Sequence, residues 1–173
     1  MQIRQANEGG IMDLITANPH NLQGTTVRDR IIEFKDKMMD LPGRLVGDSP
    51  EYLAVCPLKH TFVDGAYVRE IFLPKGTIFV TKIHKYVHPY FVMSGDASVL
   101  TEEGIVRIKG PHHGITPAGT IRVIYTHEDT VWITVHVTNE TDPEKIVEQV
   151  TAKDFDEMDE LLRLRNTSIE VAL

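Results

Sequence analysis

Two histidines four residues apart, His84 and His88, are the side chains of this sequence best suited to chemistry. They lie in GTIFVTKIHKYVHPYFVMSG, residues 76–95, a run that otherwise has the composition of a β-strand. Side chains alternate between the two faces of a strand, so Lys82, His84 and His88 share one face if this strand is continuous. Two imidazoles on one face are suited to hold a divalent transition metal such as Fe, Mn, Ni or Zn.

A metal site that keeps an open position for a substrate usually has three protein ligands. His127 is the first candidate for the third ligand, and His60 and His136 are the next. The predicted metal ligands are therefore His84, His88 and His127. Tyr90, His60 and His136 are predicted to take part in binding a ligand in the same place.

Short strands must position these side chains. From Leu53 to about residue 138 the sequence consists of β-branched and aromatic segments separated by turn signals. One such signal is Asp64-Gly65, the two-residue hairpin type, between segments 60–63 and 66–73. The residues around His112 and His113 are interpreted as a loop. About seven to nine strands with no helical pattern among them predict a closed barrel or a sandwich.

Helices are predicted on both sides of the β region. Thr26 and Asp29 stand at capping-box spacing at the start of an amphipathic segment. Asp142 and Pro143 open a second helix, and residues 154–165 form a third. Three regions are expected: an arm, helix and linker (1–52), the barrel (53–138), and a helical segment with a tail (139–173). The final residues are interpreted either as a tail or as an added edge strand.

The β region resembles the cupin superfamily of small jelly-roll β-barrels. Gly76 and Gly95 stand at the two ends of the first cupin motif, and Pro117 and Gly119 fit the second. The resemblance implies a mainly β fold, a cupin-type jelly-roll barrel with an N-terminal helix and one or two C-terminal helices. It places the metal-ligand positions of the family on four residues: Lys82, His84, His88 and Arg122.

Cationic side chains at two of these ligand positions, Lys82 and Arg122, repel a metal ion. They favour a small anion, such as a carboxylate, a phosphate or a sugar acid. The same positions therefore support two alternatives that the sequence leaves open. One is a barrel that holds a transition metal, and the other is a barrel that has lost the metal and binds an anion.

Residues 58 to 155 also resemble small cupin-like proteins encoded by bacteriophages and prophages. The likeness is carried by KHTFVDGAYVREIFLPKGT, KIHK and THEDTVWITVH. It implies a non-enzymatic accessory, structural or ligand-binding module that forms homo-oligomers and binds a phage or host protein. The alternative is a metal-dependent small-molecule enzyme, of dioxygenase, lyase or isomerase type, that uses the histidines of the barrel.

Composition limits the partners. The 173 residues carry 25 acidic and 18 basic side chains, a formal charge of −7. This charge argues against binding to nucleic acid, which needs basic surface to displace counterions. No apolar run approaches the ~18 residues of a membrane span, and the first residues lack the apolar core of a signal peptide. The expected location is the cytoplasm of a host cell, or a virion.

Overall fold

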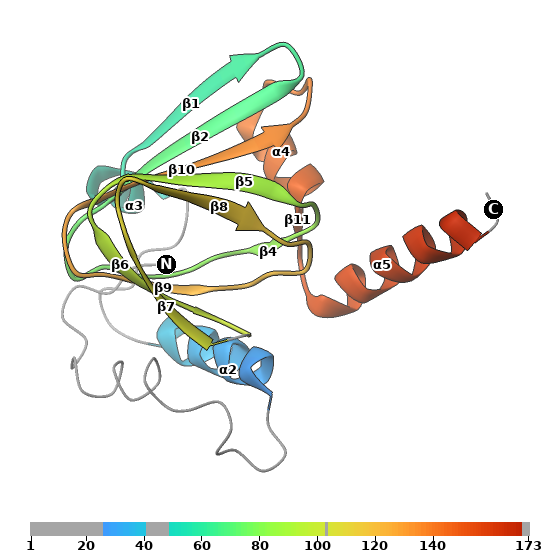
Figure 1. Cartoon of the computed structure of the whole chain (residues 1–173), viewed down its shortest axis with the longest axis horizontal. Helices are drawn as coiled ribbons and strands as arrows, with labels where there is room; N and C mark the ends of the chain where they lie inside the picture. The colour runs from blue at the N-terminus through green and yellow to red at the C-terminus, as the bar shows by residue number, and fades with distance from the viewer. Residues whose placement is uncertain (1–25, 41–48, 103, 171–173) are drawn as a thin grey trace.

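The computed structural model describes residues 26–40, 49–102 and 104–170. The arm predicted at residues 1–24 and most of the predicted linker lie outside these residues. The described chain consists mainly of antiparallel strands with helices around them (Figure 1). It therefore confirms the fold class expected from the sequence.

Two sheets face each other. The larger has five strands, in the order β1 (Leu58–Val63), β2 (Ala66–Leu73), β10 (Thr130–Val137), β5 (His88–Ser94) and β8 (His112–Thr116). The smaller has four, in the order β3 (Ile78–Val80), β9 (Val123–Thr126), β6 (Asp96–Thr101) and β7 (Gly104–Lys109). A short pair, β4 (Ile83–His84) with β11 (Thr151–Ala152), joins the barrel to its C-terminal helices.

The strand order is that of a jelly roll. Along the chain, β2, β5, β8 and β10 belong to the larger sheet, while β3, β6, β7 and β9 belong to the smaller. The chain thus crosses repeatedly from one sheet to the other, and only β6 and β7 form a hairpin within one sheet among these strands. Such crossings wind an antiparallel chain into two layers around one core.

Apolar side chains between the two sheets form the first part of the core. Trp132 and Tyr90 stack there with ring centroids 5.0 Å apart, beside buried Ile71 and Val92 from the larger sheet and Ile124 from the smaller. The inward-facing positions on each strand alternate with outward-facing ones, as the pleat requires.

The outer face of the smaller sheet is covered by helices. Helix α2 (Val27–Met39) begins with the capping box that the sequence predicts, because Thr26 accepts from the backbone of Asp29 and the Asp29 carboxylate accepts in return. Its fully buried residues, Ile31 and Met38, pack with Met158 against Ile78, Val80 and Val123 of the sheet. Burial of this apolar stripe gives α2 a stability that a 13-residue helix lacks alone.

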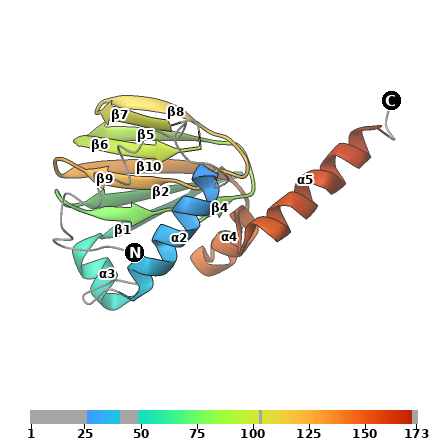
Figure 2. The same cartoon turned by 90° about the horizontal axis from the view of Figure 1, so that it is seen from below.

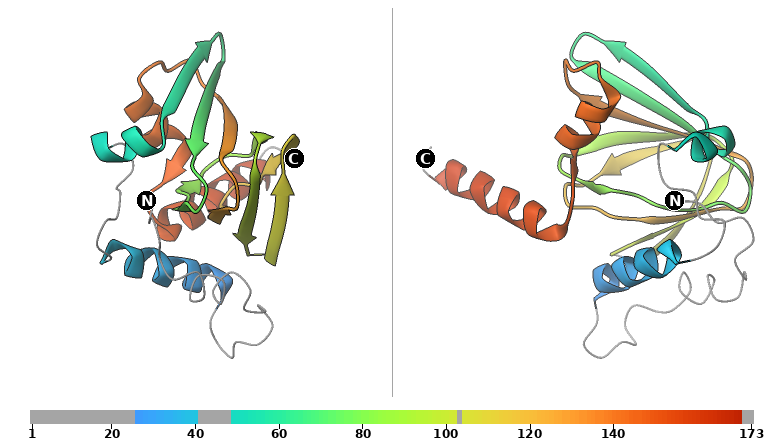
Figure 3. Two further views of the ribbon diagram at one scale, coloured as in Figure 1. Left: turned by 90° about the vertical axis from the view of Figure 1, so that its left-hand side faces the viewer. Right: turned by 180° about the vertical axis from the view of Figure 1, so that it is seen from behind.

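The remaining helices lie at the ends of the barrel. Helix α3 (Pro50–Val55) starts from a Ser49 cap, in a stretch that the sequence analysis interpreted partly as linker. Helix α4 (Pro143–Val150) lies at the end where β4 and β11 pair (Figure 3), and its Ile146 and Val150 pack on Tyr67. Helix α5 (Phe155–Glu170) continues past the predicted end at residue 165 and projects from the barrel (Figure 2).

Two strand predictions were wrong. The predicted loop around His112 is strand β8. The sequence does not look like a strand there because it contains Gly114, where the Tyr90 ring leaves no room for a larger side chain. A Cβ on Gly114 would lie 2.7 Å from the Tyr90 hydroxyl oxygen. The sequence also predicts one strand from Thr77 to Ile83, and this strand is interrupted: β3 ends at Val80 and β4 begins at Ile83. Lys82 lies in this break, so the alternation of side chains along a strand does not place it on the same face as His84.

The two glycines of the first motif provide a test of the fold. Gly76 and Gly95 both have positive φ, 76° and 100°, but only Gly95 is crowded: a Cβ there would lie 2.6 Å from the Asp129 carbonyl oxygen. We expect Gly95→Ala to lower the free energy of unfolding by about 3 kcal/mol or more. Gly76→Ala, with nothing near its Cβ, should cost about 1 to 2 kcal/mol. Equal losses in urea denaturation would contradict the crowding.

Candidate functional site

Three histidines from three strands meet inside the barrel. His84 lies on β4, His88 is the first residue of β5, and His136 is near the end of β10. One nitrogen from each ring lies within 4.8 Å of the others. The ring centroids of His88 are 4.3 Å from His84 and 4.4 Å from His136, while those of His84 and His136 are 6.0 Å apart. We call these three residues the histidine cluster.

Local hydrogen bonds fix the strands that carry the cluster. The His84 amide donates to the Thr120 carbonyl at 3.2 Å, and the Gly119 amide donates to the His84 carbonyl at 2.7 Å. Pairing of His84 with Thr151 adds β11 on the other side. Antiparallel pairing of β5 with β10, in which Thr134 faces Tyr90, brings the end of β10 to the start of β5.

The hydrogen bond of the His88 ring leaves one of its nitrogens with a lone pair. His88 Nδ1 lies 3.1 Å from the Tyr86 carbonyl oxygen, which can only accept, so Nδ1 carries the proton and Nε2 carries the lone pair. His88 Nε2 and His84 Nδ1 are both buried and have no hydrogen-bond partner among the described residues. Such a pair of unsatisfied buried nitrogens is costly unless another group binds them.

Burial keeps the cluster neutral. It lowers the pKa of His84 to about 2, with further lowering from the neighbouring histidines and from Arg122 and Arg69. It also lowers the pKa of His136 to about 4, where His88 and Arg69 contribute. The pKa of His88 is lowered by burial as well, although the hydrogen bond to Tyr86 opposes the change. Neutral imidazole is the form that binds metals.

Two guanidinium groups belong to the surroundings of the cluster. Arg122 is buried and its guanidinium carbon lies 5.1 Å from the centre of the Tyr90 ring. Arg69 stands on β2 opposite Thr134 of β10, and alternation with buried Tyr67 and Ile71 directs it to the interior. Among the described residues, the charged side chains other than histidine that lower these pKa values are the guanidiniums of Arg69 and Arg122.

Other residues predicted from the sequence lie elsewhere. His127 is outside the cluster, and its Nε2 is 2.7 Å from Ser98 Oγ on the smaller sheet. His60 is on edge strand β1, where its Nδ1 is 2.6 Å from the Tyr67 hydroxyl oxygen. Lys82 is exposed between β3 and β4. Tyr90 and Arg122 are buried, and His136 is the third member of the cluster.

The sequence contained a signal for His136. Alternation along 130–137 places His136 on one face with Trp132 and Thr134, and this is the inward face. What the sequence could not supply was the register of β10 against β5, a pairing between segments about 40 residues apart.

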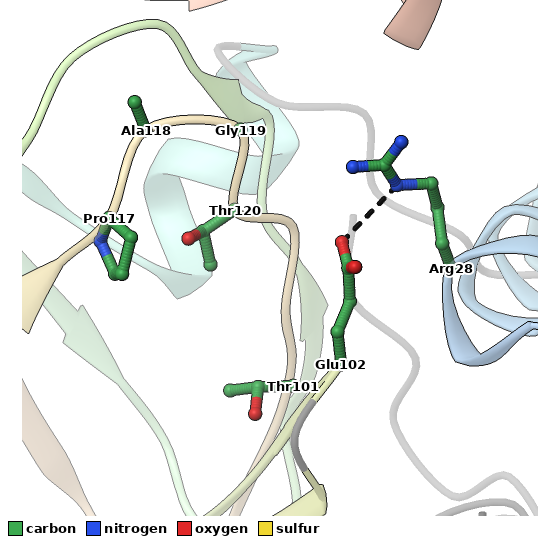
Figure 4. Close-up of a pocket in the computed structure, with 7 residues that line it drawn as sticks. All are labelled: Arg28, Thr101, Glu102, Pro117, Ala118, Gly119 and Thr120. Carbon is green, nitrogen blue, oxygen red and sulfur yellow. Dashed lines mark hydrogen bonds and ion pairs between the residues drawn. The ribbon is translucent and has the colours of Figure 1, made fainter.

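A separate small pocket lies between helix α2 and the barrel (Figure 4). The Arg28 and Glu102 side chains form an ion pair there, with Nε and Oε1 3.2 Å apart. Gly119 and Thr120 also line this pocket, and their backbones bond to His84. The pocket therefore borders the outer side of the segment that supports the histidine cluster.

The described chain is thus a jelly-roll protein with a buried three-histidine cluster. No protein-family model matches it, and no curated protein matches it. None of its described helices is long and apolar enough to cross a membrane.

Solved structures show a partial likeness. An acetylacetone dioxygenase from Acinetobacter johnsonii is 15% identical over 56% of this chain and 75% of that chain, with a TM-score of 0.41. The cupin domain of Schizosaccharomyces pombe Cnp3 is 16% identical over 53% and 69%, with a TM-score of 0.42. A predicted oxalate decarboxylase from Thermotoga maritima is 18% identical over 46% and 77%, with a TM-score of 0.40. The strand order of this chain, rather than these distant likenesses, defines it as a jelly roll.

The lowered pKa values predict acid sensitivity of the metal-free protein. An unfolded histidine takes up a proton below about pH 6.5, whereas folded His136 stays neutral down to about pH 4. The free energy of unfolding is therefore highest above about pH 6.5. It decreases as the pH falls below this value, by up to about 1.4 kcal/mol per pH unit for each such histidine. We expect the urea midpoint of chelator-treated protein to fall between about pH 7 and pH 5.

Matched variants isolate the contribution of the cluster. His136→Gln should make this pH dependence shallower, because one histidine that must be neutral is removed. His113→Gln, at an exposed position on β8, should leave the slope unchanged. An unchanged slope in His136→Gln would show that the ring takes up its proton in the folded protein.

Proposed function

We propose that this protein binds one divalent transition metal at His84, His88 and His136, and acts on a small anionic molecule beside it. The proposal rests on one observation: three ring nitrogens lie within 4.8 Å of one another in the barrel interior. Two of the three rings also have a nitrogen that is buried and without a hydrogen-bond partner in the described chain, His84 Nδ1 and His88 Nε2.

The ligand type limits the metal. Three neutral imidazoles suit Zn, Fe or Ni better than ions such as Mg or Ca, which prefer oxygen ligands. Mn was also expected from the sequence, but it is favoured by carboxylates, and the group of possible ligands found in the described chain contains only histidines. The Tyr86 carbonyl would support the site from outside, because it holds the His88 ring in the tautomer that exposes Nε2.

Residues around the cluster would determine what binds with the metal. Arg69 and Arg122 attract anions, and Arg122 is positioned over the Tyr90 ring. Stacked Tyr90 and Trp132 limit the space on the interior side. When bound, the metal supplies a Lewis acid or an oxygen-activating centre. The protein side chains would orient the anion and exclude water. This arrangement favours a metal-dependent enzyme over a non-enzymatic module.

Metal binding can be tested against the third ligand predicted from the sequence. Wild-type protein, purified without chelators or tag, is expected to contain or accept about one equivalent of Zn²⁺ by elemental analysis and calorimetry. His136→Ala should weaken Zn²⁺ binding on the order of 100-fold or more, because one of three ligands is lost. His127→Ala should bind as wild type does. Equal binding by His136→Ala and wild type would contradict the assignment.

A second candidate is a non-enzymatic module that binds an anion without a metal. Its support is electrostatic, because the positive charges of Arg69 and Arg122 act on the cluster. The phage-type accessory role, with homo-oligomers and a phage or host protein partner, belongs to this candidate. It stays a prediction that rests on the sequence resemblance.

Anion binding without metal would separate the two candidates. Chelator-treated protein would be titrated with malonate and with inorganic phosphate. If the module is correct, it binds one of them, and Arg69→Gln weakens binding about tenfold or more by removing a charged hydrogen-bond donor. Lys82→Gln is the control, because Lys82 is exposed. Binding that appears only after Zn²⁺ is added would favour the metal-dependent protein.

A further inference from the structure

Aromatic rings line the inner face of the larger sheet from its edge strand β1 to the histidine cluster (Figure 1). The register pairs Phe62 of β1 with Tyr67 of β2, and Tyr67 with His136 of β10, so these three side chains share one face. The ring centroids of Phe62 and Tyr67 are 5.4 Å apart, and those of Tyr67 and His136 are 6.2 Å apart. This row of rings connects the edge of the sheet to a proposed metal ligand.

The outer end of the row is open to solvent. Phe62 is exposed by 38%, and His60, two residues earlier on the same face of β1, is also exposed. Tyr67, in contrast, is buried, because Ile146 and Val150 of α4 pack on it. The inner face of the sheet thus reaches water at Phe62 and His60, which we call the ring pair.

The ring pair is ordered by contacts within the protein. The two ring planes differ by 6°, with centroids 6.4 Å apart. The buried Tyr67 ring is nearly parallel to both, at 20° from Phe62 and 14° from His60. Its hydroxyl oxygen lies 2.6 Å from His60 Nδ1, and this hydrogen bond holds the imidazole in its orientation. The pair therefore offers a preordered aromatic surface at the margin of the barrel.

A cationic side chain lies between the ring pair and the cluster. Arg69 of β2 is paired with His60 on one side and with Thr134 of β10 on the other. Its positive charge lowers the pKa values of both His84 and His136, so it acts on the cluster directly. Among the described residues, no carboxylate forms an ion pair with Arg69. A guanidinium in this position can bind the carboxylate of a ligand through two parallel hydrogen bonds.

We propose that the small anion bound by this protein is an aromatic carboxylate, with its ring on Phe62 and His60 and its carboxylate on Arg69. This inference rests on the function proposed above and names the chemical class of the anion. Neighbouring strands are about 4.8 Å apart, so β1, β2 and β10 place the ring pair, Arg69 and His136 in order over roughly 10 Å. The carboxylate of such a molecule lies on the side of the histidine cluster, and its ring lies toward solvent.

The chemistry of the ring pair favours an aromatic group over an aliphatic group of the same size. Two aromatic rings attract each other beyond the effect of the buried area, because the edge of one ring is positive and the face of the other is negative. Inorganic phosphate, another anion considered for this site, has no apolar part that these rings could contact. The ring pair therefore adds selectivity that Arg69 alone does not provide.

Calorimetric titration with benzoate and with cyclohexanecarboxylate tests the proposal, because the two acids match in charge and size but only benzoate is aromatic. Both are titrated into Zn²⁺-loaded and into chelator-treated full-length protein. Benzoate is expected to bind about three- to tenfold more tightly. Phe62→Leu should remove this preference, and Phe62→Tyr should keep it. Phe91→Leu is the matched control, since Phe91 is exposed by 37% but lies on the outer face of the same sheet.

Three results would overturn the proposal: equal affinities for the two acids in wild-type protein, binding of neither acid, or a preference that survives in Phe62→Leu. Failure of the metal site gives a different result, because Zn²⁺ binding is titrated separately. Protein that binds Zn²⁺ without distinguishing the acids contradicts only the role of the ring pair. Protein that binds no Zn²⁺ but prefers benzoate through Phe62 supports the ring pair and contradicts the metal-dependent function.

Discussion

Burial of three neutral imidazoles is the interaction on which the interior of this protein depends. Burial removes the water that would stabilise their charged forms. It therefore holds the pKa values of His84 and His136 far below the ordinary range of histidine. The same burial removes the partners that ring nitrogens would find in water, and His84 Nδ1 and His88 Nε2 have none among the described residues. The protein therefore bears an energetic cost at this point, and binding of a metal would remove it.

Contacts from several elements hold the cluster in place in spite of this unfavourable burial. Tyr67 stacks near His136, with ring centroids 6.2 Å apart, and packs on α4 through Ile146 and Val150. His84 is held by backbone bonds to Gly119 and Thr120. Helix α4 and the turn at 117–120 thus act on the cluster from outside the two sheets. A cluster built on strands and supported in this way is held rigidly in one arrangement.

Local signals in the sequence predicted local structure well. Thr26 and Asp29 form the expected capping box, and the hairpin at Asp64-Gly65 has the predicted position. These features depend on neighbours within a few residues. Strand β8 was missed because it contains Gly114, and glycine is unusual inside a strand. The Tyr90 ring, more than 20 residues away in the sequence, leaves no room for a Cβ at this position.

The candidate site was predicted only in part, for the same physical reason. His84 and His88 are close in the sequence and both belong to the cluster, whereas His136 joins them through the register of β10 on β5. His127 is nearer in sequence, but it extends from the end of β9 toward Ser98 on the smaller sheet. Residue type and distance along the chain do not distinguish His127 from His136 as the third histidine. Their positions in space depend on how their strands pair with the others, which is not a local property of the sequence.

Charge balance links the metal and the anion of the proposed site. Neutral imidazoles do not offset the charge of a divalent ion, and Arg69 and Arg122 add further positive charge nearby. A metal in this cluster would therefore be under-compensated until an anion entered beside it, and the anion would be held more strongly with the metal present than by the guanidiniums alone. Metal and anion should thus favour each other's binding, and by linkage each must raise the affinity of the other equally. A cluster with a carboxylate ligand in place of His88 would offset part of the charge of the metal and would need the anion less.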